Sequence, residues 1–158
     1  MIYNPINEGK TPEQISAVKS IWIEASNTKD NIWLNLFTDY GILNNHEFIL
    51  NCHNIDRKEI MKKVIEADQV CFNSSVVFGQ VSTKLIIDML DVMKDMGIKG
   101  KTFISAGYLL GGLNNGFTIP DAERFSDFFE NNYIYELDQC FKRIKYDGHK
   151  YVYVTKKD

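Results

Sequence analysis

Two short apolar segments separated by one helical pattern constrain the fold of this chain most. The segments 70–72 and 102–105 have the composition of strands that are buried on both faces. Between them, apolar residues recur at helical spacing over 82–97. Two strands joined through a helix pair in parallel. The sequence therefore predicts an α/β sheet in which the loops 73–79 and 106–112 leave the carboxyl ends of neighbouring strands, where open parallel sheets bind ligands.

The other segments complete one domain over residues 1–158. The hydrophobic share of 44% is that of an ordinary globular protein, and 158 residues suffice for about five strands covered by helices. Residues 1–18 are predicted to be an N-terminal extension that lies on the domain, with a short helical turn starting at Thr11. The remaining predicted strands are 18–25, 46–52 and 151–155, and the remaining predicted helices are 32–40 and 54–66.

The C-terminal part of the sequence supports two interpretations. From Pro120 to Lys145 apolar residues stand at helical spacing, which predicts a long helix. Asn131 and Asn132 interrupt this pattern, and 133–135 is an alternative strand. Since the most regular late strand is the C-terminal one, the edge of the sheet is expected to be rearranged.

Charge and composition exclude several classes of function. A net charge of −3 does not favour nucleic-acid binding. No apolar run approaches the roughly 20 residues of a membrane span, and the N-terminus lacks the plan of a signal peptide, so a cytoplasmic protein is expected. Cys52, Cys71 and Cys140 are expected to be reduced thiols, with Cys71 in a core strand. The histidines and cysteines have no ligand spacing, so no metal site is predicted.

Specific catalytic motifs are also missing. The sequence has no phosphate-binding Gly-x-x-x-x-Gly-Lys loop, no Gly-x-Gly-x-x-Gly after the first strand and no His-Glu-x-x-His. The segment from Cys52 to Arg57 is one residue too short for the usual phosphatase loop. Cys52 and His53 would point to opposite faces of a strand, which argues against a thiol activated by that histidine.

One part of the chain resembles a known family. The segment 67–90, ADQVCFNSSVVFGQVSTKLIIDML, resembles the third strand, flavin loop and following helix of flavodoxin-like proteins. The resemblance is closest to NAD(P)H-dependent FMN reductases and quinone reductases, and 99–112, KGKTFISAGYLLGG, is similar to their fourth strand and glycine-bearing loop. It implies a three-layer sandwich, with a parallel sheet of about five strands in the order 2-1-3-4-5 and helices on both faces.

The resemblance implies a phosphate loop after the first strand. The turn 26–31, SNTKDN, lies between a strand and a helix, where backbone N–H groups can hold an anion. It matches two hydroxyls of the flavodoxin phosphate loop, but Lys29 replaces a glycine and Asp30 adds a carboxylate. A helix-capping role for Ser26 or Thr28 is the open alternative. The residues expected to bind the FMN phosphate are Ser26, Asn27, Thr28, Lys29 and Asn31.

The flavin ring is expected between two loops. In the first, backbone N–H groups would meet the ring edge, while in the second Tyr108 would stack on the ring or shield it. Valines at 76 and 77 replace a frequent proline and aromatic residue, which lowers the expected affinity. Packing against neighbouring helices is the alternative role for Phe78 and Tyr108. The residues expected near the ring are Ser75, Val76, Val77, Phe78, Gly79, Ala106, Gly107, Tyr108 and Gly111.

The resemblance implies an FMN-dependent oxidoreductase that passes electrons from NAD(P)H to a quinone, flavin or other small acceptor. The bound ring supplies the chemistry, so no side chain is assigned as catalytic. Two alternatives stay open: a flavodoxin-type electron carrier, and a flavin-free domain that serves as a binding or assembly subunit. Such reductases are commonly homodimers. The aromatic residues Phe125, Phe128, Phe129 and Tyr133 either form that interface or pack under the sheet.

Overall fold

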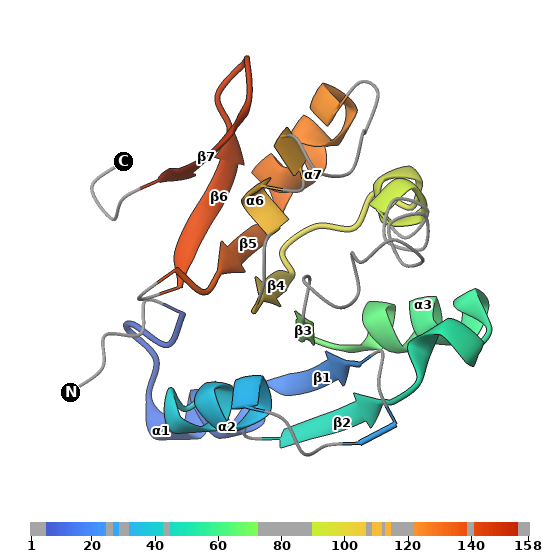
Figure 1. The fold of residues 1–158 in the computed structure, drawn as a ribbon. Helices are drawn as coiled ribbons and strands as arrows, with labels where there is room; N and C mark the ends of the chain where they lie inside the picture. The colour runs from blue at the N-terminus through green and yellow to red at the C-terminus, as the bar shows by residue number, and fades with distance from the viewer. Residues whose placement is uncertain are drawn as a thin grey trace.

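The computed structural model shows a mixed sheet with helices on both faces (Figure 1). The structure describes residues 6–24, 27–28, 32–42, 45–72, 90–106, 109–111, 113–114, 122–138 and 141–154. Its strands are β1 (Lys19–Ile23), β2 (Asn45–Ile49), β3 (Gln69–Phe72), β4 (Thr102–Ser105), β5 (Tyr133–Glu136), β6 (Lys142–Tyr146) and β7 (Tyr151–Val154).

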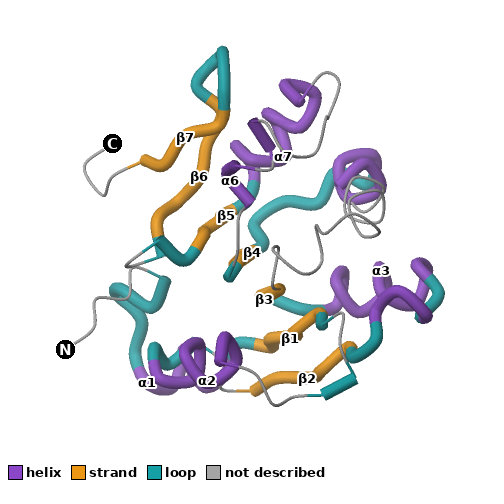
Figure 2. Tube along the Cα trace, viewed as in Figure 1, coloured by secondary structure: helices purple, strands orange, loops and turns teal. Residues whose placement is uncertain are grey.

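The strand order is β2-β1-β3-β4-β5-β6-β7. The first five strands pair in parallel, and β6 and β7 follow β5 as antiparallel neighbours. This confirms the predicted α/β class, the order 2-1-3-4-5 and the rearranged C-terminal edge. Figure 2 shows the hairpin of β6 and β7 continuing the sheet beyond β5.

Helices cover the sheet from two sides (Figure 1). α2 packs against one face of the sheet, whereas α3, a helical segment at 90–95 and α7 pack against the other. The helices are α1 (Pro12–Ala17), α2 (Ile32–Asp39), α3 (Arg57–Glu66), α6 (Leu109–Gly111) and α7 (Ser126–Asn131), with 3₁₀ turns η1 (Cys52–Asn54) and η3 (Ala122–Phe125).

Alternation along the strands divides the interior into two cores. In β1, Ile21 and Ile23 face α3, while Trp22 faces α2. The α2-side core consists of Ile6, Trp22, Leu34, Phe37, Ile42, Cys71, Ile104, Ala106 and Phe141. The larger α3-side core includes Ile21, Ile23, Ile60, Val64, Val70, Leu90, Met93, Phe103, Phe125, Phe128, Phe129, Ile134, Ile144 and Tyr151.

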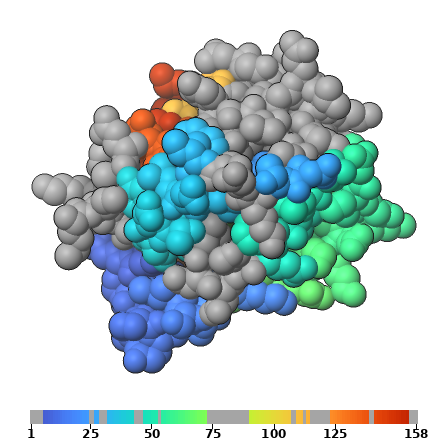
Figure 3. All heavy atoms as spheres, turned by 60° about the horizontal axis from the view of Figure 1, so that its bottom comes forward, coloured from blue at the N-terminus to red at the C-terminus, as the bar shows by residue number. Residues whose placement is uncertain are grey.

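Two residues near the N-terminus contact the rest of the chain. Ile6 is buried in the α2-side core, and the Asn7 side chain donates a hydrogen bond to the Gly41 carbonyl at 2.8 Å. A capping box between Thr11 and Gln14 starts α1. Figure 3 shows α2 at the surface, close to the N-terminal residues. The extension therefore contributes to the core rather than only lying over it.

The predicted helix over 120–145 is wrong beyond Asn131, and the alternative strand at 133–135 is confirmed. The reason is the buried side chain of Asn132. It donates to the carbonyls of Phe128 and Ile98 and accepts from the Lys101 N–H. These bonds tie the end of α7 to the segment before β4, so the chain leaves the helix there and continues as β5.

The predicted strand 46–52 is three residues too long at its carboxyl end. β2 stops at Ile49, and Asn51 has a left-handed backbone with φ of 54°. Cys52 consequently lies in η1 and not in a strand. The reasoning that Cys52 and His53 point to opposite faces of a strand therefore does not apply.

The predicted aromatic interface is a core feature. Phe125, Phe128 and Phe129 are buried in the α3-side core, so packing under the sheet is the correct alternative for them. Tyr133 alone of the four is exposed. A homodimer stays a prediction, but these three phenylalanines do not form its surface.

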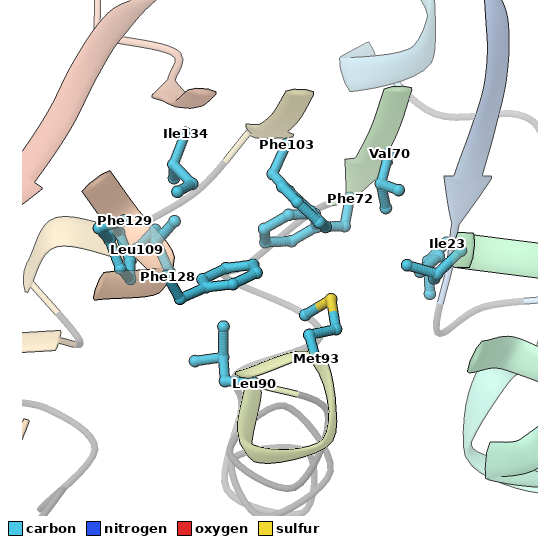
Figure 4. A pocket seen from close by; sticks show the side chains of 11 residues that line it. Ile23, Val70, Phe72, Leu90, Met93, Phe103, Leu109, Phe128, Phe129 and Ile134 are labelled. Carbon is cyan, nitrogen blue, oxygen red and sulfur yellow. The ribbon is translucent and has the colours of Figure 1, made fainter. Parts of the chain in front are cut away.

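An apolar cavity of about 40 Å³ lies in the α3-side core (Figure 4). Val70 points toward it from β3, and Phe103 from β4. Val70→Ile adds one methylene on this side and is expected to raise the free energy of unfolding by about 0.8 kcal/mol. Urea denaturation measures the change, with Val92→Ile on the surface as control. A loss of stability in Val70→Ile would show that the cavity has no room for another methylene beside Val70.

Candidate functional site

The carboxyl ends of β1, β3 and β4 meet at one edge of the sheet. Ile23 is in register with Phe72, and Phe72 with Ser105. The Ala106 N–H donates to the Phe72 carbonyl at 2.9 Å, so the pairing extends one residue beyond β4. The strand order reverses between β1 and β3, since the chain goes from β1 to β2 on one side and then returns to β3 on the other. In open α/β sheets such a switch point is where ligands bind.

Four of the predicted flavin-binding residues belong to the described part of the chain. They are Asn27, Thr28, Ala106 and Gly111. The others lie outside the described residues, and their contacts stay predictions: Ser26, Lys29, Asn31, Ser75, Val76, Val77, Phe78, Gly79, Gly107 and Tyr108.

Asn27 and Thr28 follow the carboxyl end of β1. Both are exposed, and α2 begins shortly after them at Ile32. Their polar groups therefore stand between a parallel strand and a helix, at the switch point of the sheet. This is the placement that a phosphate-binding turn requires.

Ala106 and Gly111 lie after β4. The Ala106 side chain is buried in the α2-side core and its N–H is bonded to Phe72, so a ligand would meet its carbonyl group. Among the described residues, no atom lies within 4 Å of a Cβ added at Gly111. A larger residue would fit there, so packing does not demand this glycine.

Sequence reasoning missed a buried carboxylate, Glu136, at the carboxyl end of β5. Its exposed fraction is 2%, and it accepts hydrogen bonds from the Leu110 N–H at 3.2 Å and from the Tyr153 hydroxyl. Burial raises its pKa, although these hydrogen bonds act in the opposite direction. The alternation of side chains along a strand could have predicted that Glu136 is buried, since it lies on the same face of β5 as Ile134.

Glu136 joins three segments that are distant in sequence. Leu110 is in α6, a helical turn inside the predicted loop 106–112, and Tyr153 is in the edge strand β7. The described residues on both sides of 107–108 are thus held, Ala106 by Phe72 and Leu110 by Glu136. The arrangement fixes where the loop after β4 begins and ends.

A second buried carboxylate, Glu24, follows β1 directly. It accepts a hydrogen bond from Trp22 Nε1 at 3.2 Å and faces α2, on the opposite side of the sheet from Glu136. Its backbone bonds with Ile49 and Cys52 align the end of β1 with β2. It lies two residues before Ser26, so its negative charge opposes a phosphate bound in the turn.

The cysteines with described side chains are not nucleophiles. Cys71 is completely buried in β3, which confirms its predicted place in a core strand. Burial raises the pKa of the Cys52 thiol to about 11 and raises that of Cys71 as well. Both are therefore protonated and unreactive near neutral pH.

The described residues hold no group of three His, Cys, Asp or Glu that could bind a metal ion. Within the same part of the chain, no helix has the length and apolar character needed to cross a membrane. No protein-family model, curated protein or solved structure matches the chain. The sheet order alone is thus what the chain shares with flavodoxin-like folds.

Proposed function

We propose that the protein binds FMN at the carboxyl ends of β1, β3 and β4 and transfers electrons from NAD(P)H to a quinone, flavin or other small acceptor. The supporting observation is the register of Phe72 with Ser105 beside the β1/β3 switch point. Loops that leave two neighbouring parallel strands can enclose a flat ring from both sides.

The described residues fit this cofactor in part. The exposed Asn27 and Thr28 offer polar groups to a phosphate, and the space at Gly111 leaves room beside the second loop. The charge of Glu24 works against a phosphate, but its carboxylate is turned to the α2-side core and bonded to Trp22. Bound FMN would supply hydride and electron transfer, while the chain would bind it, orient it and limit access of water.

Glu136 is the proposed positioning residue of this site. Through Leu110 it holds the end of the loop that would cover the ring. The carboxylate lies 3.3 Å or less from that N–H through both of its oxygens, so small rotations of the side chain keep the bond. The loop would then be preorganised before a ligand arrives, which reduces the entropy cost of binding.

Titration of the purified protein with FMN and with riboflavin tests the proposal. We expect quenching of flavin fluorescence by both ligands, with FMN bound more tightly because of its phosphate. Thr28→Ala should weaken FMN binding by about tenfold, the effect of one hydrogen bond to a charged group, and leave riboflavin affinity unchanged. Thr38→Ala, at the far end of α2, is the matched control.

The outcome of the titration decides between the open functions. A folded protein that leaves the fluorescence of both flavins unchanged would overturn the proposal. If both bind, NAD(P)H oxidation with a quinone acceptor tests the enzymatic part. A protein that binds FMN but does not oxidise NAD(P)H contradicts the reductase assignment.

A flavin-free binding subunit is the second candidate. The buried Glu24 directly before the predicted phosphate turn favours it, because a carboxylate at this point lowers affinity for a dianion. If the Glu24 carboxylate repels the phosphate, Glu24→Gln should increase FMN affinity. The same substitution leaves the shape of the side chain nearly unchanged, so it separates the effect of charge from that of packing.

A further inference from the structure

A groove of about 420 Å³ runs between α3 and the helical segment 90–95. Both helices pack their inner sides on the α3-side core, so the groove lies on the outer side of this layer (Figure 1). Its volume is within the range of ligand-binding clefts. None of the four described flavin-binding candidates, Asn27, Thr28, Ala106 and Gly111, lines it.

The floor of the groove is apolar, and three of its four side chains are exposed. α3 contributes Met61 and Ile65, and the other helix contributes Val92 and, just after its end, Met96. Exposed fractions are 40% for Ile65, 40% for Val92 and 54% for Met96. Only two other large hydrophobic residues of the described chain are exposed, Ile32 and Tyr133, and both lie elsewhere. Such a concentration marks an interaction site, whereas scattered apolar residues do not.

The rim of the groove is basic. Arg57, Lys58 and Lys62 line it together with one acid, Glu66, so these four residues carry a net charge of +2. The whole chain has a net charge of −3. The groove is therefore positive on an otherwise acidic protein, and an acidic partner would be attracted to it.

We propose that this groove binds an amphipathic helix of a partner protein, with apolar residues on its inner side and Asp or Glu along its flank. Met61 and Ile65 on one side of the floor, and Val92 and Met96 on the other, are pairs at i, i+4 spacing, which matches the spacing of side chains on one face of a helix. The two methionines can adapt to the shape of the inserted side chains. The cations of the rim would pair with the acids of the partner.

Two other occupants fit the groove less well. In a symmetric contact with a second copy, the rim cations Arg57, Lys58 and Lys62 would approach the same cations of the partner, and the like charges would repel. A bilayer surface needs apolar side chains that project from the protein. Here the apolar residues form the floor between two helices, with Met61 nearly buried.

The test uses the full chain and a fluorescent helical peptide of about 16 residues, with leucines at i, i+4, i+7 and i+11 and glutamates on the flanks. Fluorescence anisotropy should show binding that weakens as salt concentration rises. A peptide with lysines in place of the glutamates should bind at least about tenfold more weakly, because the rim would repel it.

Variants of the protein locate the binding site. Met96→Asp is expected to weaken binding of the glutamate peptide at least about tenfold, and so is the charge reversal Lys58→Glu with Lys62→Glu. Ile32→Asp is the matched control, because Ile32 is an exposed apolar residue outside the groove. All four substituted positions are exposed, so we expect each variant to fold, which circular dichroism checks.

Four results would overturn the proposal. They are unchanged binding by Met96→Asp, equal affinity for the lysine peptide, self-association that Met96→Asp abolishes, and sedimentation with phosphatidylserine vesicles in the absence of peptide binding. None of these results depends on flavin, since the described lining of the groove shares no residue with the described part of the β1/β3/β4 edge.

Discussion

Trp22→Ala is expected to lower the free energy of unfolding by about 4 kcal/mol. Trp22 is completely buried in the α2-side core, and its ring meets the edge of Phe37 at a centroid distance of 5.0 Å. Removing the indole ring leaves a large cavity in the α2-side core, which is the smaller of the two cores. It also removes the indole N–H that donates to the buried Glu24 carboxylate, which adds the cost of a lost hydrogen bond.

Urea denaturation followed by circular dichroism measures this effect. Trp33→Ala is the matched control, because Trp33 is only partly buried against the same core, and it should cost about 1 to 2 kcal/mol. Trp22→Phe, which retains one ring, should fall between the two alanine variants. A smaller loss in Trp22→Ala than in Trp33→Ala would contradict the placement of Trp22 at the centre of this core.

Glu136→Leu is expected to destabilise the protein by about 3 kcal/mol, because it leaves the Leu110 N–H and the Tyr153 hydroxyl without their acceptor. Glu136→Gln retains one acceptor oxygen and should cost about half as much. Thermal denaturation compares the two variants with wild type. Equal stability of Glu136→Leu and wild type would show that these hydrogen bonds are replaced by water.

The stability difference between wild type and Glu136→Gln should depend on pH in a defined direction. Burial raises the pKa of Glu136 above its value in the unfolded chain. Between these two values the folded state binds more protons, so the contribution of Glu136 to stability grows as pH falls and decreases as pH rises. The stability of wild type relative to Glu136→Gln should therefore increase as the pH falls from neutral toward 4.5, the ordinary pKa of a glutamate. Glu130→Gln controls for the loss of one negative charge from the chain.

The strands that determine the fold could be predicted because their signals are local. The segments 70–72 and 102–105 are apolar throughout, and the helical pattern between them requires a parallel pair.

The errors arise where contacts distant in sequence decide the structure. The helical spacing after Asn131 also fits strands, because Ile134 and Ile144 are core residues in either conformation. What ends the helix is Asn132, through partners near residues 98–101 that no local pattern reveals.

Local sequence signals also predicted only part of the candidate site. Its position at the edge of the sheet follows from the strand order, which the family resemblance implied. Glu136 was missed because its importance depends on Leu110 and Tyr153, which only the folded chain brings to it. A sequence shows that an acid is present, but not that burial has changed its proton affinity.

The burial of Ile6 with Phe141 has a consequence for how the chain reaches its native state. Ile6 is synthesised well before Phe141, yet the two are buried in the same cluster. Closing so long a loop is entropically costly and slow. Ile6 is therefore expected to be among the last core residues to reach its native position.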